Sequence, residues 1–499
     1  MTPTSEREHQ PLDFPSAALP LLHDAQMRGN VRHATGVIQG KRFRVVGEMP
    51  DWQLLREAGR QIRAHSLDYL DFYLEQFEQR CTAAGGHVHW ARDAAEANRI
   101  VLQLAQNPTG RVIKIKSMTT EETGLNHALE AAGIQPIETD LAELIVQLGH
   151  DKPSHIVVPA LHKNRHQVRE LFVRAMNLPH LGDRPEDLAE AARVYLRQQF
   201  LSTPVAISGA NFLIAETGGV CIVESEGNGR MCLTLPRKLI SVAGIDKIIP
   251  RFRDLEVMLQ LLPRSATGER MNPYNSVWTG VHPGDGPQEF HVVLLDNRRT
   301  EVLRDPEARE TLHCIRCGAC QNACPVYRQT GGHAYGSVYA GPIGAILTPQ
   351  LALMKRGQSL PYASTLCGAC YEVCPVKINI PEVLIHLRGR VVTGRPRSLR
   401  ALHPEAIIMR SMQWMFLSET RFRLAQQFGR IAQRPWIRRS GWIERLPSIL
   451  GGWTRTRDLR PLPQQSFREW FQARPGSASE SASKSPPQVS PESSEVPHG

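Results

Sequence analysis

Seven of the ten cysteines in this 499-residue chain lie in two short runs with regular spacing. The first run is Cys314-x2-Cys317-x2-Cys320-x3-Cys324-Pro325, and the second is Cys367-x2-Cys370-x3-Cys374-Pro375. A C-x2-C-x2-C-x3-C-P run holds iron–sulfur clusters through thiolates, and its fourth cysteine binds the other cluster of a pair. When the second run is aligned on the first, Ser364 stands where the opening cysteine would be. The spacing therefore predicts two [4Fe–4S] clusters.

The exchange of the fourth cysteine between the runs predicts two sets of ligands. The first cluster is expected to bind Cys314, Cys317, Cys320 and Cys374. The second cluster is expected to bind Cys324, Cys367 and Cys370. Its fourth position is left to Ser364, to water, to another ligand or to none. A cluster with only three cysteine ligands can lose one iron.

Other uses of cysteine fit this pattern less well. Zinc favours four ligands in paired C-x2-C knuckles, and seven cysteines with a C-P closing each run do not divide in that way. Disulfide frameworks are typical of short secreted chains rather than of a chain of this length. The isolated residues Cys81, Cys221 and Cys232 are expected to be small buried apolar side chains.

The composition is that of a soluble globular protein, with 41% hydrophobic and 22% charged residues, and the length favours two to four domains. The first ten residues are polar and no apolar stretch follows them, so no signal peptide is expected. No apolar run approaches the ~18 residues that cross a bilayer. Because cluster assembly needs reduced thiols, the sequence predicts a cytoplasmic protein.

The net charge of +10 is concentrated in one segment, 388–460, which contains sixteen Arg, no Lys and four acidic residues. Four Trp are spread among these arginines. Such a segment suits contact with a partner subunit or peripheral contact with an anionic membrane surface. It suits equally well a set of surface helices whose arginine stems cover apolar neighbours. No nucleic-acid recognition motif accompanies it, so nucleic-acid binding is not expected.

Short apolar runs alternate with helical patterns and predict an α/β fold with a mainly parallel sheet covered on both faces. Strands are predicted at 111–116, 134–138, 155–159, 205–208, 220–223, 231–235, 239–243 and 288–295. Helices are predicted from residue 51 onward and at 66–80, 119–132, 141–148, 164–176 and 185–200.

This pattern divides the chain into five parts. They are an irregular segment (1–45), an α/β domain with N-terminal helices (46–300), an α-helical ferredoxin-type domain with two clusters (301–388), a helical Arg/Trp-rich domain (389–473) and a disordered tail (474–499).

The sequence also contains residues that could form a substrate pocket. Glu216, Thr217 and Asn228 stand beside glycines whose backbone N–H groups could bind an anion, although the same residues suit an ordinary solvent-facing turn. Lys114, Lys116 and His155 fall at predicted strand positions, but a lone histidine there is more often a hydrogen-bonded core residue. The chain contains no G-x-G-x-x-G run and no P-loop, so a flavin or nicotinamide on a Rossmann unit is not expected. Paired clusters suit a relay that forwards electrons singly from a two-electron centre.

Six stretches together resemble the lactate utilization protein B family. They are ETDLAELIVQL (138–148), PSHIVVPALHK (153–163), GANFLIAETGGVCIVESEGNGR (209–230), CIRCGACQNACPVY (314–327), GPIGAILTP (341–349) and STLCGACYEVCPVKINIP (364–381). The resemblance covers about residues 50–470, and the serine in place of the opening cysteine of the second run is usual in the family.

The resemblance implies a lactate-utilization domain similar in fold to sugar-phosphate isomerases and CoA-transferases. It implies an iron–sulfur subunit that transfers electrons while L-lactate is oxidised to pyruvate. Its partners would be two sister subunits, one cysteine-rich and one with another such α/β domain; neither the electron acceptor nor the subunit that binds lactate is specified. Two alternatives stay open: that this chain itself oxidises a 2-hydroxy acid, and that it is an iron–sulfur adaptor of a glycolate-type or glycerol-phosphate dehydrogenase delivering electrons to quinone.

Overall fold

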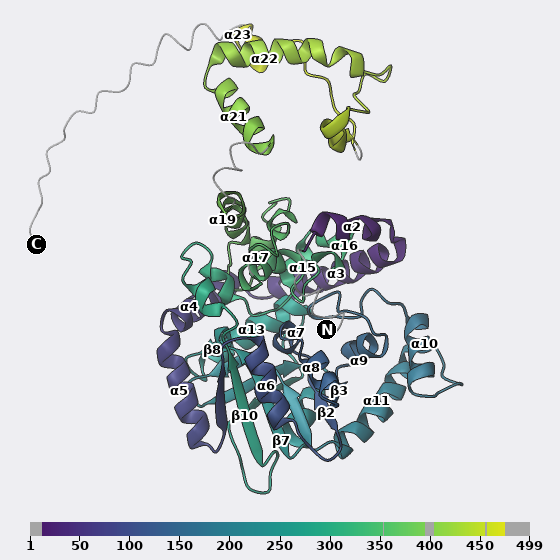
Figure 1. Ribbon diagram of the computed structural model, residues 1–499, viewed down its shortest axis with the longest axis vertical. Coiled ribbons are helices and arrows are strands. Elements are labelled where there is room, and N and C mark those ends of the chain that lie inside the picture. The colour runs from purple at the N-terminus through teal and green to yellow at the C-terminus, as the bar shows by residue number, and fades with distance from the viewer. Residues whose placement is uncertain (1–11, 353, 395–403, 455–456, 475–499) are drawn as a thin grey trace, which may run out of the picture. The chain divides into compact units, whose positions relative to one another are not determined.

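The computed structural model describes residues 12–352, 354–394, 404–454 and 457–474 (Figure 1). Contacts within the chain define two compact units, Met1–Gly394 and Arg395–Gly499. The first unit contains both sheets and both cysteine runs. The tail predicted to be disordered, beyond residue 474, lies outside the described residues.

A six-stranded parallel sheet forms the centre of the first unit (Figure 1). In spatial order its strands are β1 (His87–Ala91), β10 (Glu289–Leu295), β7 (Lys238–Gly244), β4 (Val205–Ser208), β2 (Arg111–Lys114) and β3 (Gln135–Glu138). All five neighbouring pairs run parallel, and Ile240 of β7 lies opposite both His291 and Ile207. The predicted parallel sheet is confirmed.

Both faces of this sheet are buried. Val292 and Leu294 of β10 belong to one apolar cluster, whereas Val293 and Leu295 belong to another, as expected when successive side chains point to opposite faces. The helices α6 (Ala94–Leu104) and α8 (Leu125–Ala131) cover one face. The other face packs against α5 (Leu70–Ala83), α11 (Pro185–Ser202) and a smaller sheet. Burial on both sides explains the continuous apolar runs that made these strands visible in the sequence.

The smaller sheet has the order β8 (Ile248–Ile249), β5 (Phe212–Ile214), β6 (Gly219–Glu224) and β9 (Tyr274–Trp278). β5 and β6 form an antiparallel hairpin whose turn contains Gly218 at φ 67°. A Cβ atom on Gly218 would lie 2.2 Å from the backbone nitrogen of Cys81. Glycine is therefore required there both for the backbone conformation and for the contact with α5.

The remaining elements of the α/β region are helices: α7 (Met118–Glu122), α9 (Leu141–Leu148), α10 (Arg165–Ala175), α12 (Asn228–Thr234), η1 (Ile245–Lys247), α13 (Asp254–Ala266) and α14 (Arg299–Leu303). The helix predicted at 119–132 is divided into α7 and α8 because Gly124 adopts a left-handed conformation, at φ 66°.

Two predicted strands are wrong. Residues 231–235 fall mostly in α12, which begins after Gly227 at φ 82°. Residues 155–159 form no regular element, because the Nδ1 atom of His155 accepts hydrogen bonds from the backbone nitrogens of Val157 and Val158. These local bonds occupy backbone donors that a strand would present to a neighbour.

The N-terminal segment is also different from its prediction. Residues 1–45 were expected to be irregular, but α2 (Phe14–His23) and α3 (Ala25–Gly47) are helical, followed by α4 (Trp52–Asp68). α3 is polar along most of its length and buries Met27, Val31 and Thr35. It packs on elements of the cysteine region nearly 300 residues away in sequence. Because so few of its residues face that distant partner, its own sequence shows little periodicity.

The cysteine region is helical, as predicted. Its elements are η2 (Arg309–His313), α15 (Ala319–Ala323), α16 (Tyr327–Thr330), η3 (His333–Tyr335), α17 (Gly341–Leu351), η4 (Leu360–Tyr362), α18 (Ala369–Val373) and α19 (Ile380–Thr393). α15 and α18 occupy equivalent places in the two cysteine runs and pack against one another.

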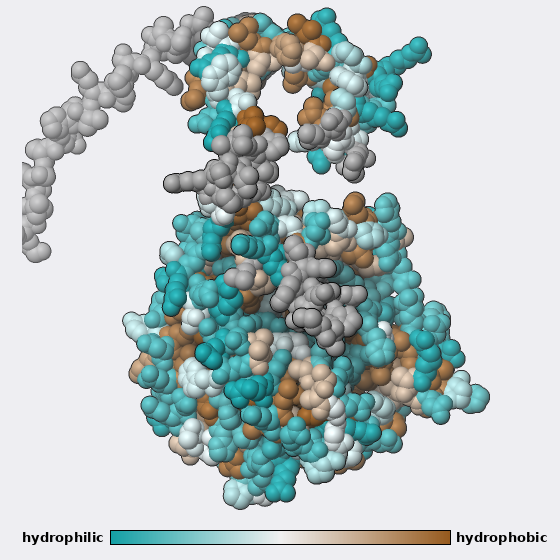
Figure 2. Space-filling view, viewed as in Figure 1, coloured by the Kyte–Doolittle hydropathy of each residue, from teal (hydrophilic) through white to brown (hydrophobic). Residues whose placement is uncertain are grey.

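The second unit contains α21 (Pro404–Phe416), α22 (Glu419–Ala432), η5 (Arg434–Trp436), η6 (Ser448–Thr454) and α23 (Phe467–Gln472). Apolar side chains gather on its surface (Figure 2). Arginines stack on its tryptophans, as where the Arg421 guanidinium lies 4.5 Å from the ring centre of Trp414. Across the described parts of both units, no helix combines the length and the apolar character needed to cross a membrane.

Candidate metal centres

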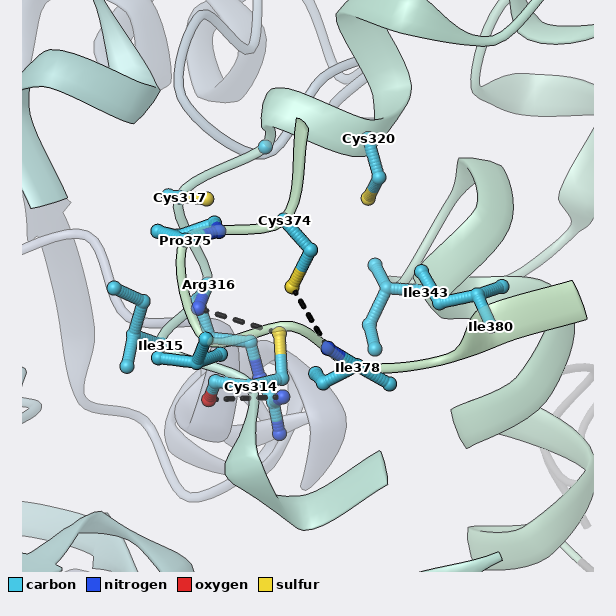
Figure 3. A pocket seen from close by; sticks show the side chains of 12 residues that line it. Cys314, Ile315, Arg316, Cys317, Cys320, Ile343, Cys374, Pro375, Ile378 and Ile380 are labelled. Atoms are coloured by element: carbon cyan, nitrogen blue, oxygen red, sulfur yellow. Dashed lines mark hydrogen bonds between the residues drawn. The ribbon is translucent and has the colours of Figure 1, made fainter. Parts of the chain in front are cut away.

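Four of the seven cysteines line one pocket, although they come from both runs (Figure 3). They are Cys314, Cys317, Cys320 and Cys374. The rest of the pocket wall is largely apolar, with Ile343, Ile378 and Ile380 facing the same space. The structure thus brings together the four residues that the spacing assigned to the first cluster.

Left-handed residues bend the first run around this pocket. Arg316 has φ 60° and Gly318 has φ 73°, and α15 begins directly afterwards. In the second run, Leu366 (φ 55°) and Gly368 (φ 81°) repeat the same alternation before α18. The two runs therefore share a loop geometry as well as a spacing. The backbone nitrogens of Arg316 and Ile378 donate hydrogen bonds to the Sγ atoms of Cys314 (3.4 Å) and Cys374 (3.3 Å).

The other three cysteines of the runs form a second group. Cys324 and Cys370 are buried and Cys367 is exposed. Burial and then the nearby Cys324 thiol raise the pKa of Cys370 to about 12, and Cys367 acts on both in the same direction. The fourth ligand of this group is still unassigned. Ser364, one of the candidates, accepts a hydrogen bond through Oγ from the Leu366 backbone nitrogen (3.1 Å). The second group is thus the more accessible of the two.

The buried thiols are poor acids in the absence of a cation. Burial raises the pKa of Cys374 to about 11, and it raises the pKa values of Cys317 and Cys320 still further, with neighbouring thiols adding to the effect. A metal centre reverses this preference, because thiolates bind metal and release their protons on doing so. Clustered thiols without disulfides, in an apolar pocket, therefore have the donor chemistry of a metal centre.

A buried ionic network lies beside Cys314 and connects the first cysteine run to the sheet. Its members are Arg63, Glu122, Asp246, Lys247, Arg299 and Arg316. The Asp246 carboxylate accepts hydrogen bonds from Arg299 Nε (2.5 Å) and Arg316 Nη2 (3.3 Å). Burial favours the neutral form of Asp246, but the neighbouring cations outweigh it and hold the pKa of this carboxyl well below its usual value.

The network contains three arginines, one lysine and two carboxylates, so its basic side chains outnumber its acidic ones. Lys247 is destabilised in its charged form: burial, followed by repulsion from Arg316, lowers its pKa to about 7. The pKa of Arg63, which donates to the backbone oxygens of Asp246, Ile248 and Leu312, is lowered by burial to about 10. A negatively charged group next to Cys314 would offset this excess.

A further buried arginine holds the second run. Arg56 is 4% exposed and donates through Nε to the backbone oxygen of Cys374 (2.9 Å) and through Nη2 to that of Tyr371 (2.9 Å). Sequence reasoning missed Arg56 and the ionic network. Arg316 stands inside the first cysteine run, and Asp246-Lys247 interrupts an apolar stretch, and these were the signals that could have indicated them.

The candidate substrate residues Glu216, Thr217 and Asn228 lie at two places in the fold. Glu216 and Thr217 lie at the β5–β6 turn, where they accept hydrogen bonds from the backbone nitrogens of Phe252 and Gly219. Asn228 begins α12, beyond the opposite end of β6, and donates to Thr139 Oγ1 (3.2 Å). The three residues are therefore held apart by the length of a strand.

The other charged candidates are internal. Lys114 is fully buried at the end of β2 and pairs with Glu138 (2.6 Å), and Lys116 lies 3.6 Å from Glu143. His155 is buried against Asn322 (3.1 Å), next to the first cysteine run, and burial lowers its pKa to about 4. The isolated Cys81, Cys221 and Cys232 are buried, and burial raises the pKa of each to about 12.

Comparison with known proteins agrees with this arrangement. Residues 74–295 match the LUD domain, and residues 310–378 match the 4Fe-4S dicluster domain. A parallel-sheet LUD domain followed by a helical dicluster domain defines an iron–sulfur protein.

The relatives give the particular family. Lactate utilization protein B from Oceanobacillus iheyensis is 42% identical over 90% of this chain and 93% of its own length. The Bacillus subtilis protein of that name is 42% identical over 89% and 93%. The chain belongs to the lactate utilization protein B family. It is equally similar, at 42% over 92% of this chain and 96% of the relative, to an Escherichia coli protein named uncharacterized electron transport protein YkgF.

Among solved structures, a DUF162 family protein from Deinococcus radiodurans is matched over 98% of its length and 45% of this chain, with 13% identity and a TM-score of 0.26.

Proposed function

We propose that this chain is the iron–sulfur electron-transfer subunit of a system that oxidises L-lactate to pyruvate. The observation that carries the proposal is the pocket in which thiols from two separate runs converge. Two clusters at these sites would accept and release single electrons. The chain's own residues bind the clusters, exclude water from the first one and set its electrostatic surroundings.

The thiols divide between two clusters as their neighbours indicate. Cys314, Cys317, Cys320 and Cys374 would hold the first [4Fe–4S] cluster, and Cys324, Cys367 and Cys370 would hold the second. The buried charge supports this assignment independently. A [4Fe–4S] core with four thiolates would be negatively charged, and the basic side chains of the network beside Cys314 outnumber its carboxylates. The first cluster would therefore suit its surroundings in the sign of its charge.

The finer features of the system follow from the family resemblance. We infer a LUD domain with an isomerase/CoA-transferase-like fold, and two sister subunits, one cysteine-rich and one with an α/β domain of the same kind. Assembly of the clusters in a reducing cytoplasm suits the absence of disulfides among the cysteines of the structure. The exposed apolar and arginine side chains of the second unit suit contact with one of these subunits or peripheral contact with an anionic membrane.

Paired alanine variants test the ligand assignment. Anaerobically purified protein should contain about eight irons per chain, with matching labile sulfide. Cys374→Ala should remove the same EPR signal as Cys317→Ala, although it lies in the other run, and Cys367→Ala should remove the same signal as Cys324→Ala. Cys221→Ala, which removes a buried thiol distant in sequence from both runs, is the matched control and should change neither signal.

Two results would contradict the proposal. About four irons or fewer per chain would exclude two full clusters. Loss of the Cys367-dependent signal in Cys374→Ala would exclude the crossed ligand sets. The substrate is tested separately: cells without this gene should fail to grow on L-lactate yet grow on glycolate, and the reverse result would favour the glycolate-type adaptor.

A further inference from the structure

A group of two histidines and one aspartate lies outside the two thiol groups. Asp151 follows α9, His162 precedes α10, and His333 opens η3. One ligand atom from each side chain can be chosen so that all three lie within 4.8 Å of one another. His162 Nε2 is 3.0 Å from Asp151 Oδ2, and the two imidazole rings meet edge to face with centres 4.8 Å apart. The residues come from both matched domains, since 151 and 162 lie in the LUD domain and 333 in the dicluster domain.

Hydrogen bonds hold both histidine rings in place. His333 Nε2 lies 2.8 Å from the backbone oxygen of Lys152. Because a carbonyl only accepts, Nε2 carries the proton and Nδ1 keeps a free lone pair. His162 Nδ1 lies 2.8 Å from Ser154 Oγ, which donates its proton to the Pro159 carbonyl (3.0 Å). His162 Nε2 donates its proton to Asp151 Oδ2 (3.0 Å), so a metal bound at Nε2 would replace this hydrogen bond and leave the ring proton on Nδ1, where the Ser154 oxygen can accept it.

The contact between His333 and the Lys152 carbonyl is of the kind that metal-binding histidines make. A ligating imidazole typically donates its second N–H to a backbone carbonyl or a similar acceptor, which fixes the ring and the tautomer. Two imidazoles and one carboxylate form a common ligand set for zinc, with a water molecule at the fourth position. We propose that Asp151, His162 and His333 bind one divalent transition-metal ion of the zinc type, which joins the LUD and dicluster domains of this chain.

One side chain competes with such an ion. Lys163 Nζ lies 2.6 Å from Asp151 Oδ2, so its ammonium group already balances the carboxylate charge. The Lys163 side chain is 16% exposed and the Asp151 side chain 30%, which leaves a path along which a flexible ammonium can move aside. Metal binding must therefore displace Lys163, and this competition gives the proposal a result that a purely structural triad does not predict.

The test measures Zn²⁺ binding to cluster-loaded protein under anaerobic conditions, by competition with a chromophoric chelator. The wild-type chain should bind one Zn²⁺, and His162→Gln and His333→Gln should each weaken binding by at least about tenfold, since even outer ligand contacts are worth ~10–100-fold. Lys163→Met should strengthen it. His127→Gln is the matched control: this histidine is 81% exposed beside Glu130 and should not matter. All variants are compared at equal iron and sulfide content.

X-ray absorption at the zinc edge identifies the ligands. Nitrogen and oxygen neighbours at about 2.0–2.1 Å, with no sulfur shell near about 2.3 Å, would support the site. A sulfur shell, or unchanged affinity in both histidine variants, would overturn it. If a histidine variant loses its clusters, Lys163→Met decides: affinity equal to or weaker than that of the wild type contradicts the proposal.

Discussion

Replacing Asp246 by asparagine tests whether the buried ionic network supports both the fold and the first thiol group. Asp246 lies in η1, directly after β7, and is 0% exposed. Its carboxylate contacts Arg299 from the sheet side and Arg316 from the first cysteine run. Asparagine has nearly the same shape and keeps one oxygen that can accept a hydrogen bond, so Asp246→Asn removes the charge with little change in packing.

The expected loss of stability is large. Breaking a buried ion pair from one side typically costs about 3–5 kcal/mol, because the remaining charge is buried without compensation. Asp246→Asn leaves Glu122 as the one carboxylate of this network facing its arginines. Since asparagine still accepts one hydrogen bond, we expect a loss near the lower limit, about 3 kcal/mol. That is a substantial part of the ~5–15 kcal/mol by which a domain is stable.

Asp246→Asn should also change the midpoint potential of the first cluster. Reduction adds a negative charge to a cluster, and removal of the Asp246 carboxylate favours that charge through simple Coulomb attraction from the unbalanced arginines. The midpoint potential of the cluster bound by Cys314 should therefore rise, and the potential of the second cluster should change less.

Two measurements check this prediction. Urea denaturation under anaerobic conditions gives the change in stability, and EPR-monitored redox titration gives the two potentials. Glu48→Gln is the control, because Glu48 and Arg270 form an exposed pair, 42% and 71% exposed, whose loss should change stability little. If Asp246→Asn were as stable as Glu48→Gln and left both potentials unchanged, the network would be neither a structural nor an electrostatic support, and the reasoning would fail.

Three further predictions concern separate parts of the first unit. Burial raises the pKa of Glu143 to about 7, so the folded state favours its protonated form and loses stability as the pH rises from about 4 through 7. Urea midpoints between pH 5 and 8 should fall less steeply for Glu143→Gln, and parallel slopes would contradict this. The Tyr327 hydroxyl donates to the backbone oxygen of Ser154 (2.5 Å), and Tyr327→Phe should cost about 1–3 kcal/mol by leaving that buried carbonyl unpaired; a loss under about 0.5 kcal/mol in the same assay would refute it. A chain ending at Gly394 keeps the whole first unit and should retain full iron and sulfide, whereas a lower iron content would show that the second unit helps to hold the clusters.

The sequence predicted the structure best where the property that produces a local sequence pattern also determines the folded element. The strands β4, β7 and β10 lie in the middle of a parallel sheet, so both of their faces are largely apolar and their sequences are rich in apolar residues. The cysteine loops were equally readable, because the spacing of the thiols is itself the loop geometry that directs them into one pocket. In both cases the pattern that identifies each strand or loop lies within a short stretch of sequence.

Most features that the sequence predicted wrongly or did not reveal depend on residues that are far apart in the chain. α3 is stabilised by contact with the cysteine region nearly 300 residues away, and residues 231–235 are apolar yet helical because a left-handed Gly227 starts α12. The ionic network joins Glu122, Asp246 and Arg316, which are tens of residues apart or more, and no pattern in the sequence pairs charges over such separations. Glu216 and Asn228, grouped as pocket candidates by nearness in sequence, lie on either side of β6, and their role in a site stays a prediction.

The two thiol groups differ in ways that bear on electron flow. Cys367 is exposed, so the second group can exchange electrons directly with a partner at the surface, whereas the first group is enclosed. If clusters occupy both groups as proposed, the arginines beside Cys314 would favour an added electron on the first one. A polar hollow of the first unit is lined by Arg60, His313 and Lys377, of which His313 adjoins Cys314 and Lys377 follows Cys374 in sequence.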